Sequence, residues 1–513
     1  MKTVFPKIFT SPILLILMTV LVKIPLLFTK NIQEDSFITW RVARNLVNYG
    51  VMGFNGSERI SASTTHLYVF ITAFFQLMFG ENFIFPLLVF SGILFGIGSW
   101  WIAKILFSES AGKRVIFLLL LNITPPALTA SFLGMEYGIL FFLYSGLLYF
   151  ALSLRKKWAF WIFPILLLWT RIDTVIFLGI FFLADLYLKK KINAQYFLGG
   201  FLGLISVISF NYFYFGELVN HTITAKNIAY KNLTQNNSTE FFLYQWAYYG
   251  GLIKKYGFAS FILFISFLTF LGFAFFKILK NRILSERSVK IILGSMLVFA
   301  LVKITVFSAF KAYFDWYYWL PRAFLFIIVL YYFLQIQKWK NKLFVGLVSF
   351  LFLSLYCFQL LQSYAIGYME ERQRMTIASD ILKSGSSLEK SILLEPAGII
   401  PFYTQLYTYD EVGLVNKRIN DEMILDEIYW WSNSVEKFQP DYILTIASQP
   451  AKADTFYLLP PGKEADFNNG YTLIKKYSIS RIHQNSPWIL RKIYEIRPIG
   501  KDYYLYRNKS SKL

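Results

Sequence analysis

The stretch FTKNIQEDSFITWRVARNLVNYGVMGFNGSERISASTTHLY, residues 28–68, follows directly on an apolar segment and carries an unusual density of charge. Glu34 and Asp35 are adjacent, and Arg41 and Arg44 follow within the next three turns if the stretch is helical. Charged groups close to hydrocarbon cost free energy unless something there needs them. The end of this apolar segment is therefore the first place to look for function.

A helix is predicted for SFITWRVARNLVNYG, because its apolar residues have helical spacing and Gly50 is placed to end it. On this helix Arg41 and Arg44 share a face, and we expect Phe37, Trp40 and Leu46–Val47 to point toward the bilayer. The helix would lie along the membrane interface with its acidic end over a site. The alternative is that Glu34 and Asp35 only cap the helix and interact with its dipole.

The composition is that of a membrane protein. Of 513 residues, 56% are hydrophobic and 20% aromatic, and long apolar runs recur along the chain. We expect about eleven transmembrane helices, with residues 158–188 forming two short spans and HLYVFITAFFQLMFG lying at the interface. The expected spans are 11–29, 84–106, 115–131, 137–153, 158–170, 174–188, 195–214, 257–279, 290–309, 321–337 and 344–364.

Charge fixes an orientation for these spans. Residues 1–365 hold 32 Lys and Arg against 12 Asp and Glu, whereas residues 366–513 hold 19 against 18. The excess falls in loops on one side of the expected spans, which the positive-inside rule makes cytoplasmic. A nucleic-acid partner is disfavoured, because its basic footprint would concentrate on the soluble part.

From about residue 366 the composition changes to mixed charge, with short β-branched runs in SILLE, DYILTIAS and YTLIKKYSI. We predict two domains: residues 1–365 in the membrane, with a first outer loop at about 30–83, and residues 366–513 as an extracytoplasmic α/β domain. Cys357 is the only cysteine and the three histidines lack metal-ligand spacing, so any metal would be held by carboxylates.

The expected topology gathers charges from separate segments on the outer face. Carboxylates there can act as general bases for a hydroxyl, and cations can neutralise a departing phosphate. This combination favours glycosyl transfer from a lipid-linked phosphosugar to an acceptor outside the membrane. The residues concerned are Glu34, Asp35, Glu136, Arg171, Asp173, Lys226, Asp315 and Arg322.

The stretch EDSFITWRVARNLVNYGVMGFNGSERISASTTHLY resembles the first outer loop of bacterial type-C (GT-C) membrane glycosyltransferases, with its D-D-[AS]-F-I-x-x-R-Y-A-R-N-L pattern. GMEYGILF, WTRIDT, FGELVNHTITAK and EPAGIIPFYTQLYTYDEVGL resemble later motifs of these enzymes in the same order. The superfamily includes protein O-mannosyltransferases, aminoarabinose transferases and mycobacterial arabinofuranosyltransferases. Departures from its patterns, which affect sugar and acceptor specificity, occur at Glu34, His66, Ile172, Thr174, Asn220 and His221.

The resemblance implies a GT-C fold and an inverting glycosyltransferase of the bacterial inner membrane, serving the cell envelope. Its donor would be a polyprenyl-phosphate sugar and its acceptor an extracytoplasmic glycan, lipid or protein. Asp35 takes the position of the catalytic carboxylate. The expected substrate-binding residues are Glu34, Arg44, Glu136, Arg171, Asp173, Lys226 and Arg322.

Within this reading Lys226 binds the lipid phosphate, with Arg171 or Arg322 as lesser candidates, and Asp315 is the weakest member. Glu136 and Asp173 orient sugar hydroxyls or hold arginines; a purely structural ion-pair network is the alternative. Whether a divalent cation takes part is left open, since monophosphate-linked donors can react without metal. Other classes are a transporter or flippase for a lipid-linked saccharide, for which Lys303 is the one mid-span charge, and a non-catalytic anchor.

Overall fold

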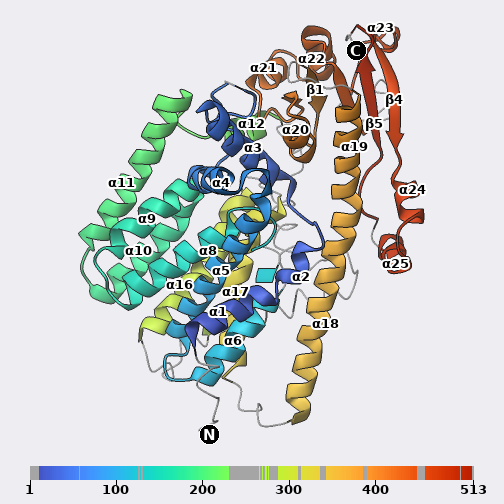
Figure 1. Cartoon of the computed structure of the whole chain (residues 1–513). Helices are drawn as coiled ribbons and strands as arrows, with labels where there is room; N and C mark the ends of the chain where they lie inside the picture. Colours follow the sequence, from blue (N-terminus) through green and yellow to red (C-terminus); the bar gives the residue numbers. More distant parts are fainter. Residues whose placement is uncertain are drawn as a thin grey trace.

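The computed structural model describes residues 11–229, 287–309, 314–335, 342–384, 390–446 and 457–510, apart from residues 57, 125, 126, 129, 130 and 497 and the side chains of residues 287, 288 and 315. It also describes residues 265, 269, 272, 273, 275 and 276. The described chain is mostly helical, with a small sheet near its C-terminus (Figure 1).

Apolar helices build the first two thirds of the fold. α1 (Pro12–Leu21) and α2 (Ile24–Leu27) precede α5 (Ile84–Leu106), α6 (Ala111–Ile123), α8 (Tyr137–Gly146), α9 (Ala159–Thr170), α10 (Val175–Lys189), α11 (Ala194–Phe210), α16 (Arg287–Ala309), α17 (Trp319–Phe333) and α18 (Lys342–Ile366). One buried apolar core runs through most of them.

Five helical stretches are long and apolar enough to cross a membrane: 84–106, 194–215, 289–309, 316–333 and 342–383. Shorter apolar stretches at 12–27, 137–153 and 159–170 fall where further spans are expected. The predicted span at 257–279 lies mostly outside the described residues. The chain thus has the helices of a membrane protein, and the count of eleven stays a prediction.

α18 continues through a π-helical turn at 367–371 into α19 (Arg372–Lys383), so that one long helix runs from the apolar part to the sheet (Figure 1). Leu343, Leu347 and Phe350 on α18 are exposed, as expected for a helix that faces lipid. At the π turn a Cβ on Gly367 would lie 2.1 Å from the carbonyl oxygen of Thr29. Glycine is needed there because the two backbones touch.

The C-terminal α/β domain contains a five-stranded sheet in the order β2-β1-β3-β5-β4. β1 (Ser391–Leu394) pairs in parallel with β2 (Tyr407–Asp410) and β3 (Tyr442–Thr445), whereas β5 (Tyr503–Asn508) is antiparallel to both β3 and β4 (Tyr471–Tyr477). Strands were expected at three of these places, in SILLE, DYILTIAS and YTLIKKYSI, and all three are confirmed.

Helices complete this domain on both faces of the sheet and at its edge. They are α20 (Ile399–Thr404), α21 (Lys417–Leu425), α22 (Trp430–Phe438), α23 (Glu464–Gly470), α24 (Ile479–Gln484) and α25 (Trp488–Ile496). α20 follows β1 after a short turn and contacts α3 (Glu34–Tyr49) (Figure 1). This contact sets how the domain meets the helical part.

α3 confirms the predicted helix, and Gly50 ends it in the left-handed conformation with φ 68°. The expected orientation of its aromatic residues is wrong. Phe37 is 3% exposed and Trp40 0%, and both pack edge to face against Phe402 of α20 rather than facing lipid. These side chains are apolar because they pack in a buried core that includes Phe402 of the C-terminal domain.

The same contact explains the arginines of α3. Arg41 is buried and donates hydrogen bonds of 2.8 Å to the carbonyl oxygens of Pro401 and Leu406. Arg44 donates to the carbonyl oxygen of Phe402 at 3.0 Å and forms a 2.6 Å ion pair with Glu81. Hydrogen bonds from charged donors each contribute about 1.5–3 kcal/mol. These cations therefore hold the C-terminal domain onto α3.

α4 (His66–Phe79) is the helix expected at the interface. One side of it is buried against α3, through Tyr68, Val69 and Thr72. The other side exposes Phe70, Phe74 and Leu77, which share one face of the helix. An amphipathic helix with such an aromatic face fits the predicted interfacial position.

Candidate active site

The first turn of α3 presents two adjacent carboxylates with different surroundings. Glu34 accepts hydrogen bonds from the backbone N–H groups of Gly398 and Ile399 at 2.9 and 2.8 Å. Its other oxygen is 3.0 Å from the guanidinium of Arg374 on α19. Glu34, predicted to bind substrate, thus anchors the C-terminal domain, and its contacts fit that role better than substrate binding.

Asp35 is partly buried, and its carboxylate accepts no hydrogen bond from any donor in the described part of the chain. Burial raises the pKa of Asp35, and Lys226 opposes that rise more strongly than any other cation. Glu136 and Glu395 raise the pKa further, and Arg171 lowers it. Asp35 is therefore a carboxylate in a charged environment whose oxygens are not committed to a partner.

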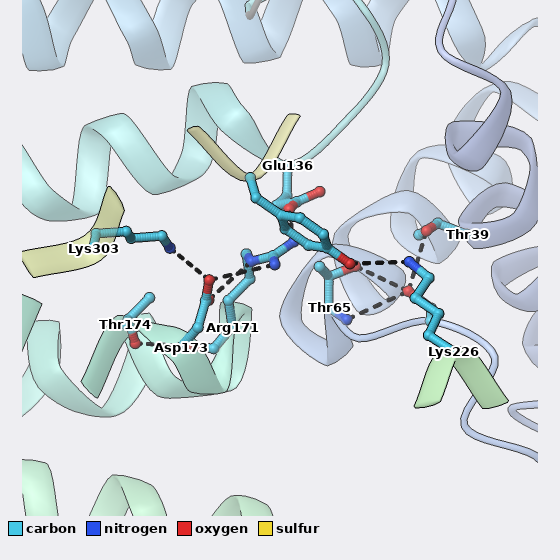
Figure 2. Close-up of polar contacts among 10 residues, drawn as sticks. Thr39, Thr65, Glu136, Arg171, Asp173, Thr174, Lys226 and Lys303 are labelled. Atoms are coloured by element: carbon cyan, nitrogen blue, oxygen red, sulfur yellow. Dashed lines mark hydrogen bonds and ion pairs between the residues drawn. The ribbon is translucent and has the colours of Figure 1, made fainter. Parts of the chain in front are cut away.

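An ion-pair network lies on the side of Glu136 and Arg171. Arg171 donates to Glu136 at 2.8 Å and to Asp173 at 3.0 Å, and the ammonium of Lys303 is 2.6 Å from Asp173 (Figure 2). Glu136 precedes α8, Arg171 and Asp173 form the turn between α9 and α10, and Lys303 belongs to α16. Three separate segments thus meet here and bring four charged residues together, as predicted for three of these residues; Lys303 was not foreseen as their partner.

Lys226 extends the site toward α12 (His221–Ala229). Its ammonium donates to the hydroxyl of Tyr317 at 3.0 Å and lies 4.9 Å from the ring centre of Phe314. The guanidinium of Arg171 is 5.7 Å from the ring of Tyr317, which therefore stands between the two cations. Figure 2 shows Lys226 and Lys303 on opposite sides of Arg171.

A row of hydroxyl groups lies near the same end of α3. Thr39, one helical turn after Asp35, is 3.1 Å from the hydroxyl of Ser63, which is 2.9 Å from that of Thr65 (Figure 2). Asn220, directly before α12, donates to the carbonyl oxygen of Ser63 at 3.4 Å. The loop carrying these hydroxyls is therefore fixed between the helix of Asp35 and the helix of Lys226.

Three further residues were predicted for the site: Arg44, Arg322 and Asp315. Arg44 is occupied by Glu81 and the carbonyl of Phe402, so its contacts are interdomain ones. Arg322 is partly buried in the first turn of α17. The side chain of Asp315 is outside the described residues.

Glu395 was missed by sequence reasoning. It follows β1 directly, is exposed, and acts electrostatically on Asp35. A signal was available, because an acid directly after a short buried strand of a parallel sheet lies at the edge where such sheets bind ligands. Tyr317 was also missed; it sits in FDWYYWLPR, which was interpreted as an aromatic belt.

The arrangement can supply a base and a group of cations, but two of its carboxylates are already paired with cationic side chains. The carboxylates of Glu136 and Asp173 are bound by Arg171 and Lys303 and are neutralised by them. Among the residues that the structure describes, no three His, Cys, Asp or Glu side chains are arranged to hold a metal ion. Cationic side chains occupy the positions where a divalent ion would compensate these acids.

In a comparison with known families, residues 364–506 match a family described as a domain of unknown function (DUF8728). The match covers the π turn, α19 and the sheet domain, and leaves out α3 and the ion-pair network. No curated protein matches the chain.

Proposed function

We propose that this protein is an inverting glycosyltransferase that moves a sugar from a polyprenyl-phosphate donor to an extracytoplasmic acceptor. The observation that carries the proposal is the uncommitted carboxylate of Asp35, close to the end of an apolar segment and under the field of Lys226 and Arg171. A base must keep its oxygens available for the substrate proton, and a lipid-borne phosphate needs cations. The motif resemblance of residues 34–68 supports the same reading.

In the proposed reaction the acceptor hydroxyl oxygen attacks the anomeric carbon of the donor sugar. The bond between that carbon and the phosphate oxygen breaks, and the hydroxyl proton passes to Asp35. The products are a glycoside of inverted configuration and a polyprenyl phosphate, whose added charge Lys226 stabilises. Tyr317 keeps the Lys226 ammonium in place through its hydroxyl.

The ion-pair network would form the sugar side of the site. Glu136 and Asp173 hold the guanidinium of Arg171 from two directions, so its remaining N–H groups keep a fixed orientation. The same contacts support the alternative that the network is structural. In either case Lys226 is the proposed partner of the phosphate, with Arg171 or Arg322 as lesser candidates.

The proposal includes a location. We infer a multi-pass protein of the bacterial inner membrane, with a GT-C fold, about eleven spans and the C-terminal domain on the extracytoplasmic side. The five long apolar helices, the three shorter apolar stretches and the basic loops of one side support this topology.

The test is donor consumption by the purified full-length protein. A panel of polyprenyl-phosphate sugars is incubated with wild type, Asp35→Asn and the control Asp421→Asn, an exposed acid on α21. We expect wild type and Asp421→Asn to release polyprenyl phosphate from at least one donor, and Asp35→Asn to lose activity by a factor of at least about 10³ while keeping its unfolding temperature. Near-normal turnover in Asp35→Asn would remove Asp35 from this role.

The same panel addresses the transporter alternative. A flippase in liposomes would carry a lipid-linked saccharide across the bilayer and leave it chemically unchanged. The pairing of Lys303 with Asp173 at 2.6 Å places this buried charge within the network near Asp35, instead of leaving it alone in a span. We therefore favour transfer, and unchanged donor on the opposite leaflet would contradict it.

A further inference from the structure

The turn after β1 joins the C-terminal domain to the candidate active site. Glu395 begins this turn, Pro396 restricts it, and the N–H of Ala397 donates to the carbonyl oxygen of Glu395 at 2.8 Å. The next two N–H groups, of Gly398 and Ile399, bind Glu34. The turn is thus fixed by β1 at its start and by the carboxylate of Glu34 at its end.

Its length limits how far Glu395 can be from the base. Three residues span at most about 11 Å, so the backbone of Glu395 lies within that distance of Gly398. Gly398 touches Glu34, the direct neighbour of Asp35. A Cβ on Gly398 would be 2.3 Å from the backbone oxygen of Glu34, which shows how closely the two backbones approach. The electrostatic effect of Glu395 on Asp35 agrees with this proximity.

Glu395 also lies at the edge of the sheet where ligands are expected. β1 is the middle strand of three parallel ones, and open sheets with parallel strands bind ligands outside the carboxyl ends of the strands. Two other acids end β2 at this edge, but both are buried and bound internally. Asp410 accepts from the N–H groups of Val412 and Leu414, and Glu411 from the ring of Trp431.

Glu395 differs from these two acids. It is exposed, and within the described ranges its carboxylate has no hydrogen bond or ion pair. Among the described residues at this edge, Glu395 therefore presents an available carboxylate, and it lies close enough to Asp35 to act on it electrostatically. An exposed acid that merely solvates the surface would not need the rigid turn and the close backbone contact that hold this one.

We propose that Glu395 positions the acceptor opposite Asp35, and that the acceptor is a polyhydroxylated carbohydrate. The inference rests on the proposed function and deepens it. Two available carboxylates in one electrostatic neighbourhood can accept from two hydroxyl groups of one molecule, one that reacts at Asp35 and one that is held by Glu395. A serine or threonine side chain offers a single hydroxyl, and an anionic acceptor would be repelled by both carboxylates.

The experiment separates acceptor use from donor use. Full-length protein in nanodiscs receives the polyprenyl-phosphate sugar that it consumes, and two rates are measured: hydrolysis of the donor by water, and transfer to probe acceptors. The probes are methyl glycosides of glucose, galactose and N-acetylglucosamine, with N-acetylserine amide and ethanolamine as non-carbohydrate probes. The variants are Glu395→Gln and Glu395→Asp, with Glu464→Gln, an exposed acid of the same domain, as the matched control.

We expect Glu395→Gln to raise the KM for the best methyl glycoside about tenfold or more, with a smaller effect on donor hydrolysis, and the control Glu464→Gln to leave both within twofold of wild type. A tenfold change corresponds to about 1.4 kcal/mol, the scale of one charge-assisted hydrogen bond. Glu395→Asp should recover part of the loss. An unchanged KM, or transfer that prefers the serine or amine probe, would overturn the proposal.

A binding measurement tests the role of Glu395 without requiring that the protein be a transferase. Saturation-transfer NMR with the methyl glycosides is run on Asp35→Asn protein, which does not turn over, and on the double variant with Glu395→Gln. Loss of the signal in the double variant supports the role of Glu395 even if no donor is consumed. Equal signals in both proteins contradict it, while consumption of donor by wild type would leave the transferase proposal standing.

Discussion

Glu34 and Asp35 show how two neighbouring residues of the same charge take different roles. They are successive residues of a helix start, so their side chains point in directions about 100° apart. Glu34 points at the C-terminal domain and receives three donors, whereas Asp35 receives none in the described part of the chain. Donors bound to a carboxylate stabilise its charged form and weaken it as a base. The uncommitted neighbour is therefore the better base.

The pH dependence of transfer should report on Asp35. A general base works in its ionised form, and burial raises the pKa of Asp35 above its usual value. The rate should therefore fall on acidification at a pH above about 4, the region of an ordinary aspartate. Because Lys226 lowers this pKa, Lys226→Gln should move the acidic limb of kcat/KM to higher pH. Glu136 and Glu395 raise the pKa of Asp35, so neutral substitution of either should move the acidic limb to lower pH. Arg171 lowers this pKa, so its substitution should move the limb to higher pH.

The measurement is a pH profile of kcat/KM for wild type, Lys226→Gln and the control Lys463→Gln, whose lysine is at the surface of the C-terminal domain. Lys226→Gln should also raise the KM for the donor, through loss of the phosphate contact. An acidic limb in Lys226→Gln at the wild-type position would contradict the coupling between the two side chains.

Glu411 gives a prediction for stability. It is buried at the end of β2, and burial raises its pKa to about 8, against about 4.3 in an unfolded chain. The folded state thus retains its proton at pH values where the unfolded state has lost it. Stability supplied by the protonated form is complete below about pH 4 and is lost as the pH rises to about 8.

We therefore expect the unfolding temperature of the C-terminal domain in the full-length protein to fall between pH 5 and pH 8. Asp410, whose pKa burial raises to about 7, acts in the same direction. Glu411→Gln should flatten this slope, because glutamine keeps hydrogen-bonding groups for Trp431 and Tyr457 but does not titrate. The check is thermal unfolding across this pH range, and an equally steep slope in Glu411→Gln would contradict the assignment.

At the scale of the element, α3 carries both the proposed base, Asp35, and the surface on which the C-terminal domain docks. Its existence and its end at Gly50 follow from local rules, which is why the sequence predicts them correctly. The direction of Phe37 and Trp40 does not follow, because helical periodicity identifies an apolar face without saying what covers it. Lipid and a distant domain demand the same residue types, so only the contact with Phe402 decides between them.

The close passage of α20 over α3 can be tested by one methyl group. Gly398→Ala would bring a Cβ to 2.3 Å from the backbone oxygen of Glu34, and backbone cannot yield as a flexible side chain can. We expect a loss of stability of about 1–3 kcal/mol from this overpacking. Displacement of the α3 start by about 1 Å should lower kcat by up to about 100-fold.

The control is Gly470→Ala, since a Cβ at Gly470 meets no atom within 4 Å. Both variants are compared by thermal unfolding and by donor hydrolysis under identical conditions. Wild-type hydrolysis in Gly398→Ala, together with a wild-type unfolding temperature, would show that the turn does not hold the α3 start.

At the scale of the whole molecule, the candidate site is assembled from α3, the turns before α8 and α10, α12, α16 and the turn after β1. Sequence reasoning selected Asp35, Glu136, Arg171, Asp173 and Lys226 because charges in a membrane protein need a reason, and all five lie in one electrostatic neighbourhood. It could not assign partners. Lys303 looked like an isolated charge in a span until the packing of α16 against α10 brought it to Asp173.

The pattern of charge compensation across these segments predicts that transfer is independent of divalent cations. A two-carboxylate metal site needs acids that are free to coordinate, yet Glu136 and Asp173 are already matched by Arg171 and Lys303 at 2.6–3.0 Å. A cation would have to displace these contacts from partly buried groups. In the proposed reaction, side chains supply the positive charge for the phosphate instead.

We therefore expect wild-type transfer to change less than twofold when the protein is treated with excess EDTA and assayed without added metal. Adding Mg²⁺ or Mn²⁺ to wild type should change the rate no further. Arg171→Gln should make transfer depend on a divalent cation, because it frees Glu136 and one oxygen of Asp173, whose other oxygen stays paired with Lys303. Abolition of wild-type activity by EDTA, with restoration by Mg²⁺, would show that the cationic side chains are not the phosphate partners and that the site uses a metal in their place.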